Sequence, residues 1–278
     1  MARIPFGVER LDDVVGGGAP AGSLVLLVGE PGAGAREFLY TSAAMNGLAT
    51  GDPELFDLHY GDVDERAETP PEIHYVSFTT GEEYLEGEMA DTMDAEIVEA
   101  ALPEVAFRDL SPEYFQLSPA PRPWYMGETR SVTDLGRSEH TDDVLDAFGG
   151  YLSRHAPGNL VLVDAVTDLV AATSEDLHWN DVAMVMKGLK KAAREWGGLI
   201  VALANREVLD PTQLGKLTDA ATGTLVFEWE SGGSQRARTL FVKAFRGVLS
   251  RLEEENIVRF ETEVHEAGFD VTNVRKIR

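Results

Sequence analysis

The chain has 278 residues, of which 44% are hydrophobic, so it can bury a substantial core in one large domain or two small ones. It carries 48 acidic and 24 basic residues, a formal net charge of -24, and such a surface repels nucleic acid and anionic lipid. The absence of cysteine excludes disulfides, thiol catalysis and cysteine-ligated zinc.

The environment of the protein can also be predicted from its composition. No apolar run approaches the roughly 18 residues that span a membrane, and the N-terminus lacks the apolar segment of a signal peptide. We therefore expect a cytoplasmic protein without a membrane span. The strong acidity favours a salt-rich, haloarchaeal cytoplasm, because at 1 M salt the Debye length of about 3 Å suppresses self-repulsion.

Strand and helix patterns alternate along the first two thirds of the chain. Continuous apolar runs, typical of strands buried on both faces of a parallel sheet, occupy residues 24–28, 73–78, 160–163 and 199–203. Helical patterns occupy residues 37–48, 82–101, 142–155 and 181–196. The alternation predicts an α/β fold with a mostly parallel central sheet flanked by helices.

The last part of the chain has a different pattern. Strand candidates follow one another at residues 222–229, 238–244, 256–263 and 270–276, with a Gly232-Gly233 turn between the first two. They indicate antiparallel strands added at the C-terminal end of the sheet. Residues 51–71 and 111–139 are expected to be loops or insertions, and residues 1–278 to form a single domain, because no internal repeat or clear boundary is present.

A glycine-rich segment follows the first apolar run and opens a helix: Gly29, Glu30, Pro31, Gly32, Ala33, Gly34, Ala35 and Arg36. Its glycines would let backbone N–H groups surround an anion at a helix N-terminus. In the phosphate-binding pattern G-x-x-x-x-G-K-[ST], the Lys reaches the β/γ-phosphates and the hydroxyl binds Mg²⁺. Ala35 and Arg36 stand at those two positions. The alternative is an ordinary strand-to-helix turn.

Loss of these two side chains predicts weak nucleotide binding. At about 1.5–3 kcal/mol for each charge-assisted hydrogen bond, the two losses cost about 3–6 kcal/mol, a hundredfold to ten-thousandfold in affinity. One step around a helix turns a side chain by about 100°, so we expect Arg36 to point away from the phosphates. Replacement of the missing Lys by its long guanidinium is the alternative.

The apolar run at residues 160–163 ends in Asp164, where phosphate-loop enzymes hold Mg²⁺. This position makes Asp164 a candidate for a vestigial Mg²⁺ site. An ordinary turn or helix-capping Asp is the alternative.

The residues after the second apolar run lack the acid that a hydrolase of this architecture would use to activate water. Thr79 and Thr80 stand there, and threonine cannot act as a general base near neutral pH. Glu82 and Glu83 are candidate catalytic replacements. Both are also compatible with solvated acidic residues in the first turn of a helix.

Two cations near the C-terminal strands complete the candidate site. Lys243 and Arg246 could reach a phosphate on a neighbouring subunit, or could simply neutralise local carboxylates. The six histidines show no metal-ligand spacing, and no histidine metal site is predicted.

The segment that leads into the glycine loop is more specific than the loop itself. Residues 6–23, FGVERLDDVVGGGAPAGS, follow the pattern G-x-x-x-L-D-x-x-x-G-G-G-x-P-x-G-S and resemble the opening of KaiC/RadA-type RecA-like ATPases. The stretches at residues 164–169 and 243–247 extend the resemblance over most of the chain. It implies a RecA-like fold, ATP and Mg²⁺ bound at a subunit interface, and homo-oligomeric rings or protein partners.

The departures from the family pattern all lie at positions that take part in the reaction, as in haloarchaeal members labelled KaiC-like or HTR-like. They predict a degenerate protein that acts as a regulatory or scaffolding interaction module, with weak or lost ATP and Mg²⁺ binding. One alternative is an atypical active ATPase that uses Arg36, Asp164 and Glu82 or Glu83. The other is a DNA recombination accessory protein, which the net charge of -24 disfavours.

Overall fold

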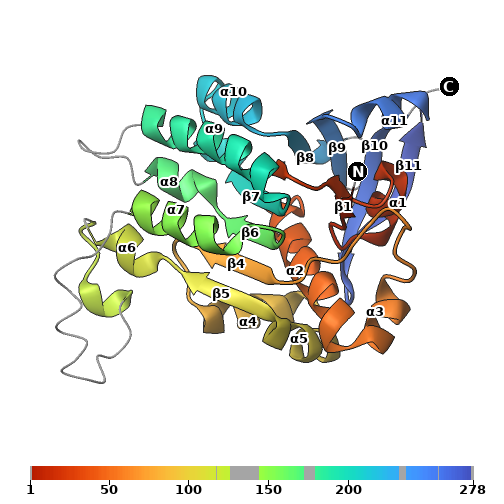
Figure 1. Cartoon of the computed structure of the whole chain (residues 1–278), viewed down its shortest axis with the longest axis horizontal. Helices are drawn as coiled ribbons and strands as arrows, with labels where there is room; N and C mark the ends of the chain where they lie inside the picture. Colours follow the sequence, from red (N-terminus) through yellow and green to blue (C-terminus); the bar gives the residue numbers. More distant parts are fainter. Residues whose placement is uncertain are drawn as a thin grey trace.

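The computed structural model describes residues 2–116, 118–125, 144–171, 179–231, 236–255 and 257–276. Within these ranges, nine strands form one sheet in the order β11-β10-β9-β8-β3-β7-β6-β4-β5. Helices cover both faces of the sheet (Figure 1). A separate short pair, β1 (Arg3–Ile4) and β2 (Ala19–Pro20), ties the N-terminal segment together.

The centre of the sheet is parallel. Its strands are β3 (Ser23–Gly29), β4 (Ile73–Ser77), β5 (Val105–Asp109), β6 (Leu160–Asp164), β7 (Leu199–Asn205) and β8 (Gly223–Ser231). β3 pairs in parallel with β7 and β8, and β6 pairs with β7 and β4. Strands at the middle of such a sheet are buried on both faces, which is why they were visible as continuous apolar runs. The α/β prediction is confirmed.

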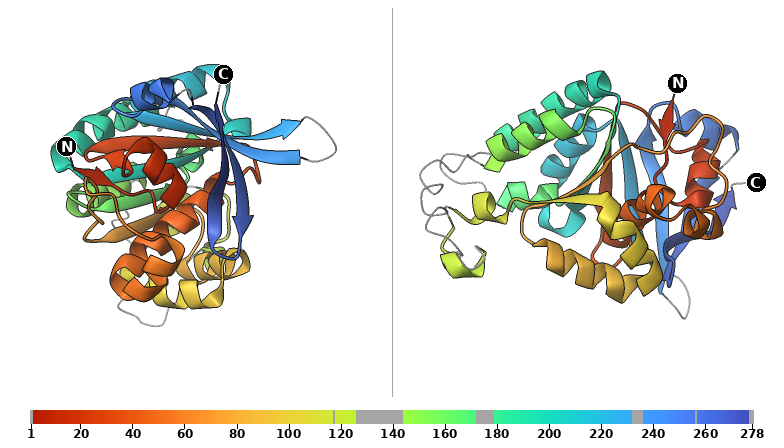
Figure 2. Two further views of the ribbon diagram at one scale, coloured as in Figure 1. Left: turned by 90° about the vertical axis from the view of Figure 1, so that its right-hand side faces the viewer. Right: turned by 60° about the horizontal axis from the view of Figure 1, so that its bottom comes forward.

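Three antiparallel strands extend the sheet beyond β8: β9 (Arg236–Phe245), β10 (Ile257–His265) and β11 (Gly268–Lys276). They pair in succession, β8 with β9, β9 with β10 and β10 with β11, and continue the sheet as Figure 2 shows. The predicted antiparallel addition at the C-terminal end is therefore confirmed. The Gly232-Gly233 turn lies outside the described residues.

Side chains of the parallel strands alternate between two apolar cores. In β3, Val25 and Leu27 belong to the core under α2 (Ala35–Gly51), whereas Leu24, Leu26 and Val28 belong to the core on the opposite face. The α2 side also holds α1 (Glu9–Val15), α3 (Pro53–His59), α4 (Glu82–Thr92), α5 (Ala95–Ala101) and α11 (Leu249–Glu254). The opposite side holds α7 (Val144–His155), α8 (Val166–Ala171), α9 (Trp179–Trp196) and α10 (Pro211–Ala220).

Several boundaries differ from the sequence prediction. The helix expected over residues 82–101 is broken into α4 and α5, because the backbone at Met93 is extended and Asp94 N–H bonds to Glu266 O at 2.7 Å. Residues 51–71 contain α3, whose first turn is capped by the Asp52 carboxylate. Of residues 111–139, the described part includes α6 (Ser111–Phe115), while residues 117 and 126–139 lie outside the described ranges. Edge strand β5 is only partly buried and was not predicted.

Candidate functional site

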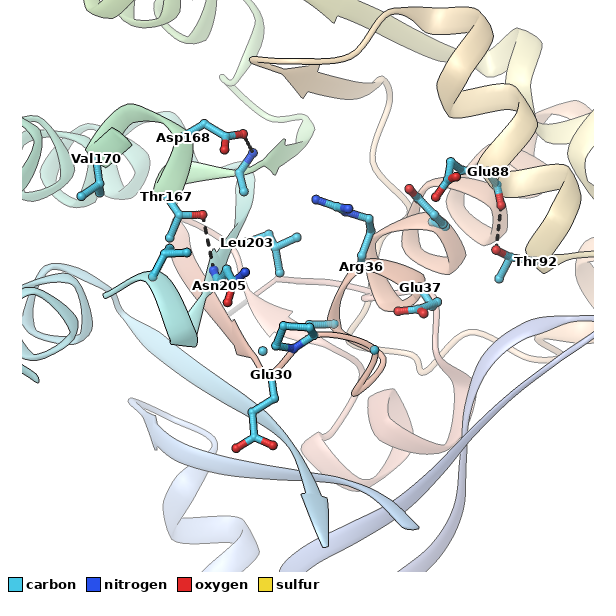
Figure 3. A pocket seen from close by; sticks show the side chains of 17 residues that line it. Glu30, Arg36, Glu37, Glu88, Thr92, Thr167, Asp168, Val170, Leu203 and Asn205 are labelled. Carbon is cyan, nitrogen blue, oxygen red and sulfur yellow. Dashed lines mark hydrogen bonds between the residues drawn. The ribbon is translucent and has the colours of Figure 1, made fainter. Parts of the chain in front are cut away.

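The glycine loop joins the end of β3 to the start of α2 and forms one wall of a cavity of ≈ 420 Å³. The other walls come from α4, from the segment after β6 and from the end of β7 (Figure 3). This is the carboxyl edge of the parallel strands, where open α/β sheets bind their ligands. Of the predicted loop residues, Gly29, Glu30, Pro31, Gly32, Ala35 and Arg36 line the cavity, whereas Ala33 and Gly34 are buried and do not.

Side chains from β8 and β9 hold the loop by its carbonyl groups. Trp229 Nε1 donates to Pro31 O at 3.0 Å, and Arg238 Nε donates to Gly32 O at 2.9 Å. The Arg238 guanidinium also lies 4.9 Å from the Trp229 ring centroid, a cation–π contact. α2 then begins without a side-chain cap, so its first amides keep the ability to bind an anion.

The glycines of the loop have structural reasons to be there that do not involve a phosphate. Gly34 has φ +104, and a Cβ on it would lie 2.8 Å from Phe269 Cε2. A Cβ on Gly29 would lie 2.5 Å from Ala35 Cβ. Side chains are thus excluded at both positions by packing, and at Gly34 also by its left-handed backbone.

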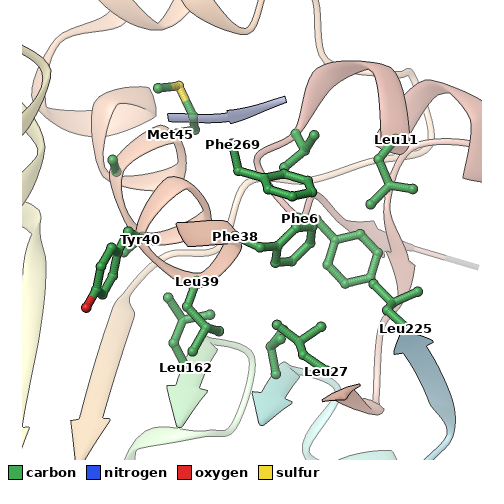
Figure 4. Close-up of a cluster of buried hydrophobic side chains, with 14 of the residues drawn as sticks. Phe6, Leu11, Leu27, Phe38, Leu39, Tyr40, Met45, Leu162, Leu225 and Phe269 are labelled. Atoms are coloured by element: carbon green, nitrogen blue, oxygen red, sulfur yellow. The ribbon is translucent and has the colours of Figure 1, made fainter. Parts of the chain in front are cut away.

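Behind the loop, an aromatic cluster joins distant parts of the chain (Figure 4). The Phe38 ring on α2 lies 5.7 Å from Phe6, 5.5 Å from Phe227 and 5.4 Å from Phe269, measured between centroids. Phe269 N–H also donates to Thr41 Oγ1 at 2.7 Å. The N-terminal lead, the loop helix and the C-terminal hairpin therefore pack together and fix the loop.

The side chain of Arg36 extends into the cavity (Figure 3). Its Nη2 donates to Asp164 Oδ1 at 3.1 Å, while Tyr75 Oη donates to Asp164 Oδ2 at 2.8 Å. The expectation that Arg36 points away from the site is therefore wrong. A side chain of this length can reach the carboxylate from its position on the first turn of α2.

The Arg36–Asp164 pair is asymmetric in exposure: 53% of the Arg36 side chain is exposed, against 10% of Asp164. Burial lowers the pKa of Arg36, but the charge of Asp164, the hydrogen bond to it and the nearby Tyr40 and Tyr75 together raise it more. The pKa of Arg36 therefore lies above its ordinary value, and the guanidinium stays charged. Burial, together with the Asp164 charge, also raises the pKa of Tyr75, which keeps its phenol protonated as a donor. The Asp164 carboxylate is therefore compensated from within the chain.

Carboxylates outnumber cations in the rest of the cavity wall. Glu30, Glu37, Glu88 and Asp168 line it together with Arg36. Glu30 is engaged, because its carboxylate accepts from Trp229 N–H at 3.2 Å and lies 3.5 Å from Arg206 Nη1. Burial raises the pKa of Asp168 to about 6, while Ala165 N–H donates to its Oδ2 at 3.3 Å. This wall would repel a triphosphate that arrived without a cation.

Glu82 and Glu83 are exposed at the start of α4 and do not line the cavity. Glu88 and Thr92, on the same helix, do line it. The buried residue Leu85 lies three and seven positions before these two, so helical periodicity from the apolar positions could have identified them.

Thr79 and Thr80 also lie outside the cavity lining. Ser77 Oγ and Thr80 Oγ1 are 2.7 Å apart and share a hydrogen bond, and Thr80 N–H donates to Ser77 Oγ at 3.1 Å. These hydroxyls therefore stabilise the turn after β4.

Lys243 and Arg246 do not reach the glycine loop of their own chain. Lys243 is exposed on β9. Arg246 lines a different cavity of ≈ 530 Å³ at the beginning of β3. This cavity lies at the amino-terminal ends of the parallel strands, whereas the glycine loop lies at their carboxyl ends. The other basic residues in its wall come from α9: Lys187, Lys190, Lys191 and Arg194. This basic groove was not predicted, because Arg246 is remote in sequence from the α9 cations.

Comparison with known proteins adds information on the fold. No protein-family model and no curated protein matches the sequence. The structure is similar to the crystal structure of a KaiC-like protein from the hyperthermophilic archaeon Pyrococcus horikoshii OT3, with a TM-score of 0.59. The two are 18% identical, and the match covers 98% of this chain and 99% of the other. The fold is RecA-like.

A RecA-like fold with a glycine loop implies a site for ATP and Mg²⁺, and the residues present here do not fit the metal. Position 36 offers a guanidinium where the metal requires a hydroxyl, and this guanidinium already bonds the Asp164 carboxylate. A second cation on the same oxygen would be repelled by the first.

No helix among the described residues has the length and apolar character needed to cross a membrane.

Proposed function

We propose that this protein is a catalytically degenerate RecA-like protein of the KaiC type that does not hydrolyse ATP. It acts as a regulatory or scaffolding module through contacts with protein partners or with further copies of itself. The observation that supports this proposal most strongly is the hydrogen-bonded ion pair between Arg36 and Asp164.

The ion pair bears on catalysis because it involves the two positions that would hold the metal. In a phosphate-loop enzyme, Mg²⁺ bridges the β- and γ-phosphates and neutralises the charge that develops during transfer. Arg36 supplies a positive charge at this place but is fixed to Asp164 at 3.1 Å. A guanidinium has no acceptor atoms and no exchangeable ligand positions, so it cannot replace the coordinating role of the ion.

The groups around the pair support the same proposal. Ala35 offers no cation to the phosphates, and Glu30, Glu37, Glu88 and Asp168 add negative charge to the cavity wall. Glu82 and Glu83, the candidate bases, lie outside the cavity lining. ATP binding is therefore weak or lost, and water attack on a γ-phosphate lacks a positioned base.

Two further parts of the proposal rest on composition. A formal charge of -24 is compatible with a folded chain in the salt-rich cytoplasm of a haloarchaeon, where charge repulsion is screened. The same charge argues against a nucleic-acid partner, although the basic groove around Arg246 is the surface on which DNA would be tested.

An atypical active ATPase is the second candidate, since Arg36 lines the cavity beside the uncapped start of α2 and could contact a phosphate. Phosphate release at saturating Mg·ATP, in about 2 M KCl, separates the two candidates. Our proposal predicts a rate equal to that of an Asp164→Ala variant and to the protein-free background. Turnover by the wild type that Arg36→Ala or Asp164→Ala abolishes would instead establish the ATPase.

A further inference from the structure

Three residues from two distant segments of the chain meet at the amino-terminal ends of the parallel strands, opposite the glycine loop. Glu72 directly precedes β4, His74 is the second residue of β4, and His155 is the last residue of α7. Each offers one ligand atom, and these atoms lie within 4.8 Å of one another. None of the three takes part in the site described above.

We propose that Glu72, His74 and His155 form a binding site for one zinc ion or a similar divalent transition-metal ion. Two imidazoles and a carboxylate are the ligands of several zinc sites that keep a fourth position open for water. The Glu72 side chain is 62% exposed, so solvent can reach the open position.

The distances within the cluster fit such an ion. Zinc binds nitrogen and oxygen at about 2.0–2.2 Å, so two of its tetrahedral ligand atoms lie about 3.4 Å apart. His74 Nε2 and Glu72 Oε2 are 3.1 Å apart. Three ligand atoms spread over as much as 4.8 Å need a displacement on the order of 1 Å to share one ion. Rotation of the exposed Glu72 side chain and of His155, at the end of its helix, can supply it.

Residues next to the cluster hydrogen-bond to its ligands and orient them, as residues around the ligands of known metal sites do. Tyr151 Oη lies 2.9 Å from His74 Nδ1, the nitrogen that would not bind the ion. Asn159 Nδ2 donates to Glu72 Oε2 at 3.1 Å and to His155 O at 2.9 Å. A metal-bound His74 would carry its proton on Nδ1 and donate to Tyr151, whereas the metal-free His74 would donate from Nε2 to Glu72.

Zinc binding can be measured on the untagged full-length protein after removal of metals with a chelator. Titration calorimetry with zinc sulfate, in sodium sulfate so that chloride does not compete for the ion, should give one tight site per chain. His155→Ala and Glu72→Gln should each weaken that site tenfold to a hundredfold or more. His265→Ala is the matched control, because His265 Nε2 also lies near a carboxylate, 3.8 Å from Asp270 Oδ2.

A spectroscopic arm distinguishes this site from weak binding by surface carboxylates. Cobalt(II) should give an absorption spectrum typical of nitrogen and oxygen ligands that His155→Ala removes. On zinc addition, the His74 nitrogen resonances should report protonation at Nδ1. The proposal is overturned if the wild type shows only weak sites of high stoichiometry, or if its tight site is unchanged in both His155→Ala and Glu72→Gln.

Discussion

Arg36 Nη2 lies 3.1 Å from Asp164 Oδ1, and the two residues are 128 positions apart in the chain. The contact joins the first turn of α2 to the end of β6. In phosphate-loop enzymes, an Asp at the end of a strand attracts a bound metal ion. The Arg36 guanidinium compensates the charge of the largely buried Asp164 carboxylate.

Arg36→Ala should lower the free energy of unfolding by about 1 kcal/mol, because a charged hydrogen bond to a buried carboxylate is lost while the half-exposed pair is partly screened. Asp164→Asn keeps an acceptor for Tyr75 but removes the charge. The double variant should therefore be more stable than the sum of the two single effects predicts. Chemical denaturation of the four proteins gives the coupling energy, and a value of zero would show that the pair is not a stabilising contact.

Gly34→Ala should lower the free energy of unfolding by about 1–3 kcal/mol, because it places a Cβ at φ +104 and 2.8 Å from Phe269. Gly188→Ala on α9 is the control, since a Cβ there would have no atom within 4 Å apart from its own helix backbone, and it should raise stability by up to about 1 kcal/mol. Equal stabilities of the two variants would show that neither the backbone conformation nor the contact with Phe269 excludes a side chain at Gly34.

Asp168, which lines the cavity, should make the free energy of unfolding depend on pH. Its pKa rises from 3.8 unfolded to about 6 folded, so its contribution to stability is present below pH 3.8 and is lost as the pH rises through about 6. Asp168→Asn should therefore stabilise the protein at pH 8, by at most about 3 kcal/mol, and by much less at pH 4. Denaturation at both pH values measures this, with exposed Asp57→Asn as the control for the general loss of one negative charge. A pH-independent gain would contradict the assignment.

The net charge of -24 predicts that the folded state depends on salt. In about 0.1 M KCl the melting temperature should be far lower than in 2 M KCl, because the Debye length shortens from about 10 Å to less than 3 Å. Sucrose of equal osmolarity controls for general solute exclusion. Full stability at low salt, followed by circular dichroism, would argue against a halophilic protein.

Much of the fold could be predicted from the sequence, because buried parallel strands leave continuous apolar runs and the C-terminal strand candidates follow one another without intervening long helices. Edge strand β5 escaped prediction because its residues are half-exposed, and α4 and α5 were merged because helical periodicity continues across the break at Met93. Both errors arise from tertiary contacts that local patterns do not encode.

The site was less predictable than the fold. The sequence alone showed that Ala35 and Arg36 stand where the phosphate-binding pattern has Lys and a hydroxyl, and it showed where Asp164 lies. The direction of Arg36 could not be predicted, because rotation around a helix says nothing about how far a long side chain bends toward a charge. The cluster of Glu72, His74 and His155 was not predicted for another reason. The pairing of β4 with β6 brings His155 close to the other two residues, and no short sequence motif contains all three.

The proposed loss of metal-dependent nucleotide binding follows from Ala35 and the Arg36–Asp164 pair. It is tested by titration calorimetry of ATP, with and without Mg²⁺, into the wild type and into Ala35→Lys/Arg36→Thr. Ala35 lines the cavity, so a Lys at this position would extend into it. We predict no Mg²⁺-dependent binding by the wild type, and a gain of roughly a hundredfold or more in Mg²⁺-dependent affinity for the double variant. Micromolar, Mg²⁺-dependent binding of ATP by the wild type would show that Ala35 and the Arg36–Asp164 pair do not prevent it.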